Sequence, residues 1–215
     1  MKFTNNQIDL LRAEMKKRLS NKRFIHTLGV ERMAVIIGEK CLPNEVDSLR
    51  IAALLHDISK EYSEEEHLTL LERYNVKLDD GEYDQTPLWH SVTAPLAVRE
   101  HFSSFATEQI LSAVRHHTVG CPGMNTFDEI ILLSDYIEEG RTYEKCVKLR
   151  ESFLRELSNT EEADQCIVLL HSAVVKSLDN NIQEFVSRGK AFHERTLLTR
   201  DAISNKIEGK NNGRN

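Results

Sequence analysis

The sequence predicts an all-α protein built as a single helical bundle. Apolar residues recur at helical spacing along most of the chain, as Ile51, Leu54 and Leu55 illustrate. Strand-like alternation is nearly absent, and the 215 residues include only nine glycines and four prolines. A chain of this length forms one sizeable domain. We expect that domain, an HD-type bundle for reasons given below, over residues 1–206, and a polar, disordered tail over 207–215.

The first third of the chain is predicted to contain four helices. We expect them over residues 5–20, 22–41, 44–59 and 64–74. Pro43 closes the second helix, and Asn44 is the expected N-cap of the third. Ser63 and Glu66 have the spacing of a capping box, which would open the fourth.

The rest of the chain is predicted to continue as helices joined by loops. The polar segment 78–85 is expected to be a loop. Further helices are expected over 87–102, 106–117 and 126–139, and two or three more up to about residue 206. Pro95 removes a backbone donor, so it should bend or break the helix that contains it. Gly140 is the expected C-cap of the helix before it.

The charge of the chain and its lack of long apolar segments argue against several classes of partner. The formal net charge is −6, so we expect no nucleic-acid partner. No apolar stretch approaches the ~20 residues that cross a bilayer, and residues 1–6 lack the apolar core of a signal peptide. The four cysteines form no CxxC pair and are expected to be reduced thiols. We therefore expect a cytoplasmic protein with no membrane partner, and a homodimer remains open.

The adjacent pair His56-Asp57 is the most informative feature of the sequence. It ends an apolar helix, and Lys60 follows one turn later. An imidazole nitrogen and a carboxylate oxygen together suit iron, manganese, zinc or cobalt. If the pair stood alone, a histidine at a helix end beside a solvated aspartate would be the better explanation. Its interpretation therefore depends on further ligands elsewhere in the chain.

Two distant residues could complete a metal site with this pair. Asp135 lies within the apolar run 130–137, and burying a carboxylate is costly unless it is paired or bound to a cation. Arg141 is the nearest residue that could pair with it instead. His26 lies early in its helix, where it could ligate a metal or donate to a backbone carbonyl.

Four polar residues are candidates for substrate binding or catalysis. His90 and His117 each lie at a helix end, where either could bind a second metal, bind phosphate, donate a proton or simply face solvent. Lys60 beside a metal would attract a phosphate oxygen, although most helix-end lysines interact only with terminal carbonyls. Arg141 could clamp a phosphate or pair with Asp135, and the sequence favours neither.

The candidate ligands follow one another in a recognisable order: His26, His56-Asp57, His90, His117 and Asp135. In this order the chain resembles the HD-domain superfamily of metal-dependent phosphohydrolases. More narrowly, it is similar to the YqeK family of symmetrical bis(5′-nucleosyl)-tetraphosphatases. The segments that carry the similarity are 52–60, 88–90, 114–120 and 133–141, and the likeness covers roughly residues 5–205.

The resemblance implies a metal site, a set of substrate contacts and a reaction. The implied metal is iron, with manganese, cobalt or zinc as alternatives and one ion or two, held by His26, His56, Asp57 and Asp135. The implied catalytic residues, which also bind a small nucleotide substrate, are Lys60, His90, His117 and Arg141. Further implied substrate contacts come from His26, Thr118 and Asp135. The implied reaction hydrolyses diadenosine tetraphosphate at its centre and releases two ADP.

The chain departs from the family pattern at three places. Glu194-Arg195 replaces a proline-aspartate pair after His193, Pro95 interrupts a helix that is normally unbroken, and His116 stands where an aromatic is usual. These departures concern the nucleotide contacts more than the metal site.

Three other functions fit part of the pattern. An HD-type nucleotidase or phosphohydrolase would act on mononucleotides. A non-catalytic regulator would bind a nucleotide without turnover, and the complete ligand set argues against it. A purely structural helical protein would bind no metal.

Overall fold

The computed structural model describes residues 3–212, with side chains described through residue 209. These residues form eleven α-helices, three short 3-10 turns and no β-strand, which confirms the predicted all-α class. The helices are α1 (Asn5–Arg18), α2 (Asn21–Cys41), α3 (Val46–Leu55), α4 (Glu64–Arg73), α5 (Asp80–Tyr83), α6 (Trp89–His101), α7 (Glu108–His116), α8 (Thr126–Ile137), α9 (Glu144–Ser158), α10 (Ala163–Ser187) and α11 (Glu194–Asn212).

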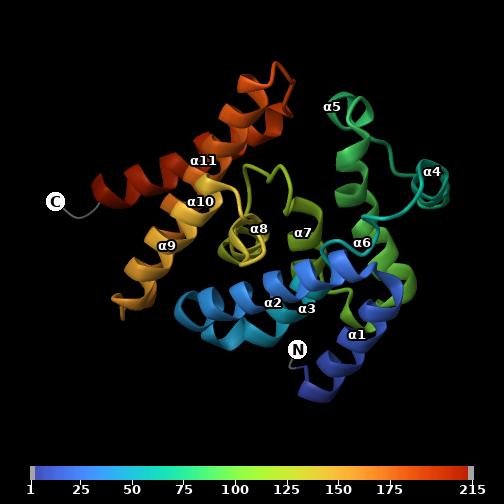
Figure 1. Cartoon of the computed structure of the whole chain (residues 1–215), viewed down its shortest axis with the longest axis horizontal. Coiled ribbons are helices and arrows are strands. Elements are labelled where there is room, and N and C mark those ends of the chain that lie inside the picture. The colour runs from blue at the N-terminus through green and yellow to red at the C-terminus, as the bar shows by residue number, and fades with distance from the viewer. Residues whose placement is uncertain (1–2, 213–215) are drawn as a thin grey trace.

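The helices are arranged around a central group formed by α2, α3, α7 and α8 (Figure 1). Helix α2 packs against α3 and α8, and α7 packs against the same two helices. Helices α1, α4, α5 and α6 lie at one end of the molecule, and α9, α10 and α11 lie at the other (Figure 1). No helix within the described residues is long and apolar enough to span a membrane.

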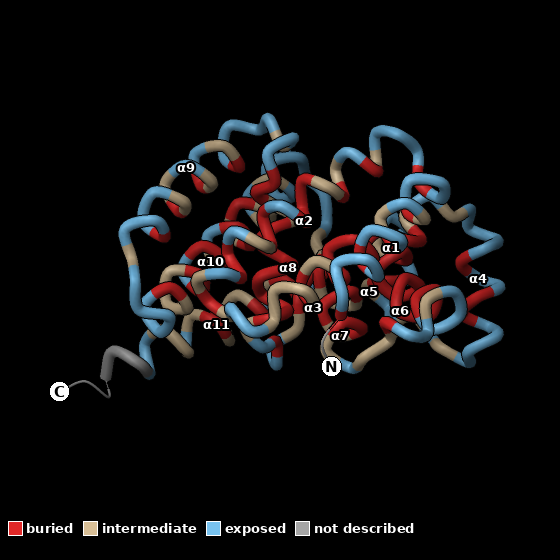
Figure 2. Tube along the Cα trace, turned by 90° about the horizontal axis from the view of Figure 1, so that it is seen from below, coloured by how far each residue is buried: buried red, intermediate tan, exposed pale blue. Residues whose placement is uncertain are grey.

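The core is centred on α3 and α8, which are almost entirely buried (Figure 2). Ile51, Leu54 and Leu55 have no exposed surface, and neither do Ile130 and Ile131. Burying a side chain of this size contributes roughly 1.5–3 kcal/mol. The packing of α3 therefore carries the residues that follow it into the interior of the bundle.

The chain forms tight turns directly after α3. Helix α3 ends at Leu55 rather than at the predicted residue 59. The next hydrogen bonds span three residues instead of four: the Ile58 N–H donates to Leu55 O at 3.1 Å, and the Lys60 N–H donates to Asp57 O at 2.9 Å. His56 and Asp57 consequently lie in tight turns at the end of the helix, not within it.

Two predicted helix caps are wrong. Asn44 lies inside a 3-10 turn, Pro43–Glu45, that precedes α3, so it does not cap the α-helix. Gly140 lies beyond the end of α8, because Glu138 already has the non-helical angles φ −55° and ψ 155°. The Gly140 N–H donates to the Glu138 carboxylate at 2.5 Å. The carbonyls at this helix end are satisfied by Arg150 in place of a glycine cap, because its Nη1 donates to Glu138 O at 2.8 Å and to Ile137 O at 3.3 Å.

Helix α6 and the segment before it also differ from prediction. Helix α6 runs unbroken through Pro95, although proline removes one helical hydrogen bond. Residues 89–98 are all buried, and α6 packs against α4 and α7, so tertiary packing holds this helix together. Helix α5 occupies part of the predicted loop 78–85, where Asp79 and Glu82 form a capping box around a single turn.

The remaining helices agree with prediction to within a few residues. The capping box of Ser63 and Glu66 is present at the start of α4. At the other end of the chain, α11 continues to Asn212. The helix thus extends over residues 207–212 of the predicted tail, whose residues 213–215 lie outside the described part of the chain.

A buried group of ion pairs joins α5 to α7 and α11. Glu82 is 2% exposed and pairs with Arg115 and with Arg195 Nη1, which lies 3.0 Å from its Oε1. Arg195 also pairs with Asp79, whose Oδ1 lies 3.0 Å from His193 Nε2. Arg195 is one of the departures from the family pattern, and here it neutralises two carboxylates. Asp79, Glu82 and His193 could hold a cation, but the two arginines already supply positive charge.

We predict that Glu82→Gln lowers the free energy of unfolding by about 3 kcal/mol at neutral pH, because it removes a buried carboxylate that pairs with two half-buried arginines. Burial alone would raise the pKa of Glu82, but Arg115 and Arg195 outweigh it and lower this pKa below its ordinary 4.5. The stabilisation is therefore present above pH 4.5 and is lost as the pH falls through the lowered pKa. Urea unfolding at neutral and acidic pH should show the difference between the two proteins shrinking in acid. The exposed Glu194→Gln is the control, and an equal loss in both variants would contradict the assignment.

Candidate metal centre

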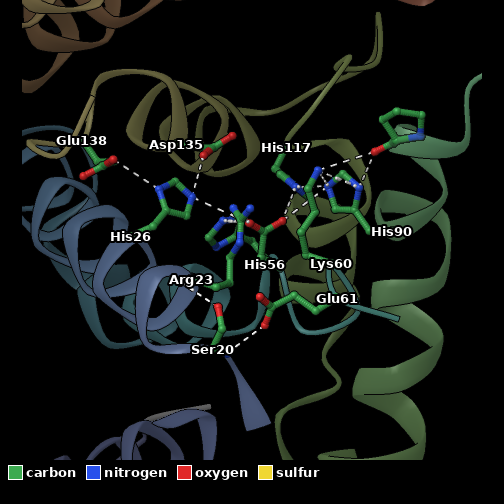
Figure 3. Close-up of polar contacts among 12 residues, drawn as sticks. Ser20, Arg23, His26, His56, Lys60, Glu61, His90, His117, Asp135 and Glu138 are labelled. Carbon is green, nitrogen blue, oxygen red and sulfur yellow. Dashed lines mark hydrogen bonds and ion pairs between the residues drawn. The ribbon is translucent and has the colours of Figure 1, made fainter. Parts of the chain in front are cut away.

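The structure brings the predicted His-Asp residues together around one carboxylate, Asp57. Figure 3 shows His26 and His56 on one side of the site and His90 and His117 on the other. Asp57, which is 3% exposed, lies between them and presents a different oxygen to each side. It thereby belongs to two separate groups of potential metal ligands.

The first group consists of His26, His56 and Asp57. Asp57 Oδ2 lies 3.3 Å from His56 Nε2 and 3.7 Å from His26 Nε2. The three residues come from α2 and from the turn after α3, and α2 and α3 pack closely together. Residues 30 positions apart in the sequence thus meet because two neighbouring helices in the chain are neighbours in space.

The second group consists of Asp57, His90 and His117. Asp57 Oδ1 lies 3.4 Å from His90 Nε2 and 3.5 Å from His117 Nε2, and these two nitrogens are 3.1 Å apart. His90 comes from the first turn of α6, and His117 directly follows α7. All three residues are at most 3% exposed, so their converging atoms are shielded from water.

Three of the imidazoles have the same tautomer imposed by the backbone. The Nδ1–H of His56 donates to Ala53 O at 2.6 Å. The corresponding group of His90 donates to Pro87 O at 2.8 Å, and that of His117 donates to Val114 O at 2.7 Å. Carbonyl oxygens only accept, so each Nδ1 carries a proton, and the Nε2 of each neutral ring is left to offer its lone pair. All three Nε2 atoms lie within 3.5 Å of an Asp57 oxygen.

This arrangement fits a metal ion. Lone pairs of His90 and His117 face each other and a carboxylate, which is unfavourable unless a cation lies among them. The buried Nε2 of His56 has no hydrogen-bond partner among the described residues, and the Nε2 of His26 lies beside carboxylates, with Asp135 Oδ1 at 3.0 Å and Asp57 Oδ2 at 3.7 Å. Ligand atoms bound at about 2.0–2.2 Å to one ion lie about 3–3.5 Å apart, which matches the spacing within the second group. Backbone bonds to Nδ1 are the usual means of orienting metal-binding histidines.

The protonation of the second group agrees with this assignment. Burial alone would raise the pKa of Asp57, but the neighbouring His56 and His117 hold it well below its ordinary range. Burial lowers the pKa of His90 well below its ordinary value, and the nearby charge of Lys60 lowers it further. The second group thus contains an ionised carboxylate and a neutral imidazole, which are the forms that bind metals.

The predicted ligand Asp135 lies beside the first group but outside it. Its Oδ1 is 3.0 Å from His26 Nε2 and 2.8 Å from Arg141 Nη2. Arg141 Nε also donates to Asp135 O at 3.2 Å. Of the two alternatives that the sequence left open for Arg141, pairing with Asp135 is the contact observed. Asp135 can still turn toward a cation held by His26, so its role as a ligand stays a prediction.

Glu138 is a functional residue that the sequence analysis missed. Its Oε1 lies 3.2 Å from His26 Nδ1, so it orients His26 as the backbone orients the other histidines. A Cβ at Gly29 would come within 2.4 Å of Glu138 Oε2, so any side chain at position 29 would displace this carboxylate. Burial alone would lower the pKa of His26, but Asp135 and Glu138 raise it to about 9. The signal in the sequence was a carboxylate three residues after Asp135, directly after the same helix.

Arg23 and Lys60 supply positive charge at the centre. Arg23 Nη1 lies 2.6 Å from Asp57 Oδ2, a contact that the sequence analysis also missed. Its signal was its position three residues before His26 in α2. Lys60 Nζ lies 3.1 Å from His90 Nδ1 and 3.2 Å from His90 Nε2 (Figure 3). Burial lowers the pKa of Lys60, since its ammonium group is partly removed from water.

The turn that carries Asp57 is fixed against α6. Ser59 Oγ donates to His90 O at 3.1 Å and lies 2.9 Å from Thr93 Oγ1. His67 Nδ1 lies 2.8 Å from the same threonine oxygen. His67 is buried and packs edge-on against Trp89. These bonds hold the two halves of the centre in register.

The predicted nucleotide contacts line a cavity of about 600 Å³ next to the centre. His117, Thr118, Asp135 and Arg141 lie along it, whereas Lys60 and His90 line a smaller cavity of about 190 Å³. The Thr118 hydroxyl is buried without a hydrogen-bond partner among the described residues. The structure therefore places the predicted contact residues on two sides of the centre.

Comparison with known proteins identifies one matching family and several relatives. The family described as "HD domain" matches residues 23–168. A symmetrical bis(5′-nucleosyl)-tetraphosphatase from Bacillus subtilis (strain 168) is 31% identical over 189 residues, which cover 87% of this chain and 92% of the relative. A protein of the same name from Halalkalibacterium halodurans is 29% identical over 185 residues, covering 86% of this chain and 90% of the relative.

One solved structure has the same fold. It is described as a predicted HD superfamily hydrolase involved in NAD metabolism from Clostridium acetobutylicum. It superimposes with a TM-score of 0.78 and covers 96% of this chain and all of its own. At 24% identity, this similarity supports the fold alone.

Proposed function

The chain belongs to the HD domain family, and from this membership we propose that it hydrolyses dinucleoside tetraphosphates symmetrically. The proposed substrate is diadenosine tetraphosphate, and the proposed products are two ADP. The family match bears out the resemblance seen in the sequence and the expectation that the chain is a hydrolase.

Two lines of support lead to the substrate. The relatives that align with about nine-tenths of this chain are named symmetrical bis(5′-nucleosyl)-tetraphosphatases. The observation in this protein that carries the proposal is Asp57, which joins two histidine groups beside a 600 Å³ cavity lined by Arg141. A polyphosphate chain needs cations on both sides of the bond that breaks, and this geometry offers them.

We propose that the centre holds two metal ions that share Asp57. His26 and His56 would complete one site, with Asp135 as an additional ligand, and His90 and His117 would complete the other. Iron is the metal implied by the resemblance, and the same nitrogen and oxygen donors also suit manganese, cobalt or zinc. When bound, such ions activate water and offset charge on phosphoryl oxygens.

The chain's own residues would bind and orient the phosphates. Arg141 lines the large cavity and Lys60 lines the small one, so each would contact a different half of a tetraphosphate. Their positive charges would stabilise the charge that develops on the bridging oxygen as it leaves. Because His90 and His117 donate Nδ1–H to carbonyls, we assign them to metal binding rather than to proton donation.

Product analysis tests the proposed reaction. Purified protein, loaded with Fe²⁺ without oxygen or with Mn²⁺, would be incubated with diadenosine tetraphosphate, and the products would be separated by chromatography. Symmetrical hydrolysis gives ADP alone. AMP with ATP would contradict the central cleavage, and activity restricted to mononucleotides would favour a nucleotidase.

We predict that Arg141→Ala lowers kcat/KM by about 10- to 100-fold, the value of one or two charge-assisted hydrogen bonds to phosphate. Arg141→Lys should recover only part of this loss, because lysine cannot make the bidentate contact. Steady-state kinetics with diadenosine tetraphosphate would measure both. The control is Arg32→Ala, since Arg32 is an exposed arginine that pairs with Glu139. Unchanged kinetics in Arg141→Ala would exclude a substrate contact.

A further inference from the structure

The 600 Å³ cavity lies among α8, α9 and α10, which pack against one another (Figure 1). Its volume is within the range of about 300–1,000 Å³ that is usual for small-molecule sites. The cavity on the other side of the centre, beside Lys60 and His90, is about 190 Å³ and falls below that range. Of these two cavities, only the larger has room for a nucleoside.

At the inner end of the large cavity, His117, Asp135 and Arg141 adjoin the metal centre. Elsewhere along its lining, Arg188 Nη2 lies 2.5 Å from Glu184 Oε1, and Lys145 Nζ lies 3.2 Å from Gln183 Oε1. Bound metal ions would be the largest positive charges beside the cavity. A ligand with one anionic end and one uncharged end would therefore enter with its phosphates at the centre and its uncharged part outward.

The outer end of the cavity exposes aromatic rings. Tyr143, directly before α9, is 65% exposed, and Phe185, near the end of α10, is 38% exposed. Both line the cavity. Exposed aromatic side chains at the mouth of a cavity are suited to stacking on a nucleobase, an interaction worth about 1–3 kcal/mol.

A buried amide lies farther into the same cavity. Asn180, on α10, is 5% exposed and lines the wall beside Tyr136. An amide offers both donors and an acceptor, so it can form hydrogen bonds with the edge of a base. The cavity thus combines aromatic surface, a buried polar group and an inner end beside the metal centre.

We propose that this cavity is the binding site for one nucleoside of the substrate, with the base stacked on Tyr143 and Phe185 and its edge near Asn180. The inference rests on the proposed function for the identity of the ligand. It adds that the protein recognises a single nucleoside, because the second cavity is too small to enclose another. The other half of the substrate is held mainly through its phosphates.

Equilibrium binding of ADP and of pyrophosphate tests the site without turnover. Calorimetry on the metal-loaded protein would compare the wild type with Tyr143→Ala and Phe185→Ala. We expect each substitution to weaken ADP binding about 5- to 100-fold, and to leave pyrophosphate binding unchanged because pyrophosphate has no base. Tyr143→Phe keeps the ring and should bind ADP like the wild type.

The matched control is Tyr74→Ala, which removes a ring that is 36% exposed and lies outside the cavity. ADP affinity that stays within twofold of wild type in both cavity variants would overturn the proposal. So would an equal loss of ADP and pyrophosphate binding, which would indicate an effect on the phosphate site. The measurement needs no hydrolysis, so a failure of the proposed reaction would be seen separately, in the product analysis.

Discussion

Asp57→Asn should abolish metal binding in both groups and lower kcat by at least about 1,000-fold. Asp57 is the one residue shared by the two groups, and it is their only carboxylate among the described residues. Asparagine keeps the shape but removes the charge and places an NH₂ group where one oxygen faced a metal. Metal ions contribute several kcal/mol to transition-state stabilisation in such reactions, and about 1.4 kcal/mol corresponds to tenfold in rate.

Elemental analysis and kinetics on the same preparation would measure this effect. Glu138→Gln is the milder comparison, because it weakens the contact that orients His26 but replaces no proposed ligand. Substitutions of this supporting kind cost about 10- to 100-fold in metal affinity or activity. Circular dichroism would establish that both variants keep the helical fold. An Asp57→Asn protein with full metal occupancy would refute the assignment of the centre.

Lys60→Met should lower kcat by about 100- to 1,000-fold while leaving the metal content unchanged. Lys60 lies against His90 at 3.1 Å but belongs to neither ligand group. Methionine has a similar length and removes only the charge that would stabilise a leaving phosphate. Loss of one such donor costs about 10²–10³ in kcat in enzymes that stabilise developing negative charge.

Two measurements on the Lys60 variants distinguish a contact with phosphate from support of the metal ligands. Kinetics would report the loss of rate, and metal analysis would show whether the centre is intact. Lys60→Arg should retain part of the activity because the charge remains. Lys77→Met, at an exposed position, is the control. A Lys60→Met protein that loses its metal together with its activity would show that Lys60 supports the ligands instead.

The sequence predicted the helices well because their signals are local. The spacing of apolar residues and the capping box of Ser63 and Glu66 depend only on neighbours in the chain. The errors occurred where tertiary contacts decide. Pro95 remains inside an unbroken helix because that helix is buried, and Gly140 is no cap because Arg150 donates to the carbonyls at the end of α8. Neither burial nor a long-range side-chain contact can be read from local spacing.

The residues of the candidate site could be predicted from the sequence, but the contacts between their atoms could not. His26, His56, Asp57, His90 and His117 do converge, as their order along the chain suggested. What the sequence could not give is which atoms face one another. That Asp57 divides its two oxygens between two groups depends on how α6 and α7 are placed relative to α2. Arg23 was missed for the same reason, since its partner lies 34 residues away.

The three backbone-bonded histidines have a consequence for how the centre can change over evolution. His56, His90 and His117 each donate to a carbonyl three residues earlier in the chain. Every residue type has a main-chain carbonyl, so a substitution at the accepting residue or between it and the histidine leaves the ring orientation intact. His26 instead depends on the side chain of Glu138, 112 residues away. Homologous chains should therefore tolerate substitutions near His56, His90 and His117, whereas positions 26 and 138 should change only together.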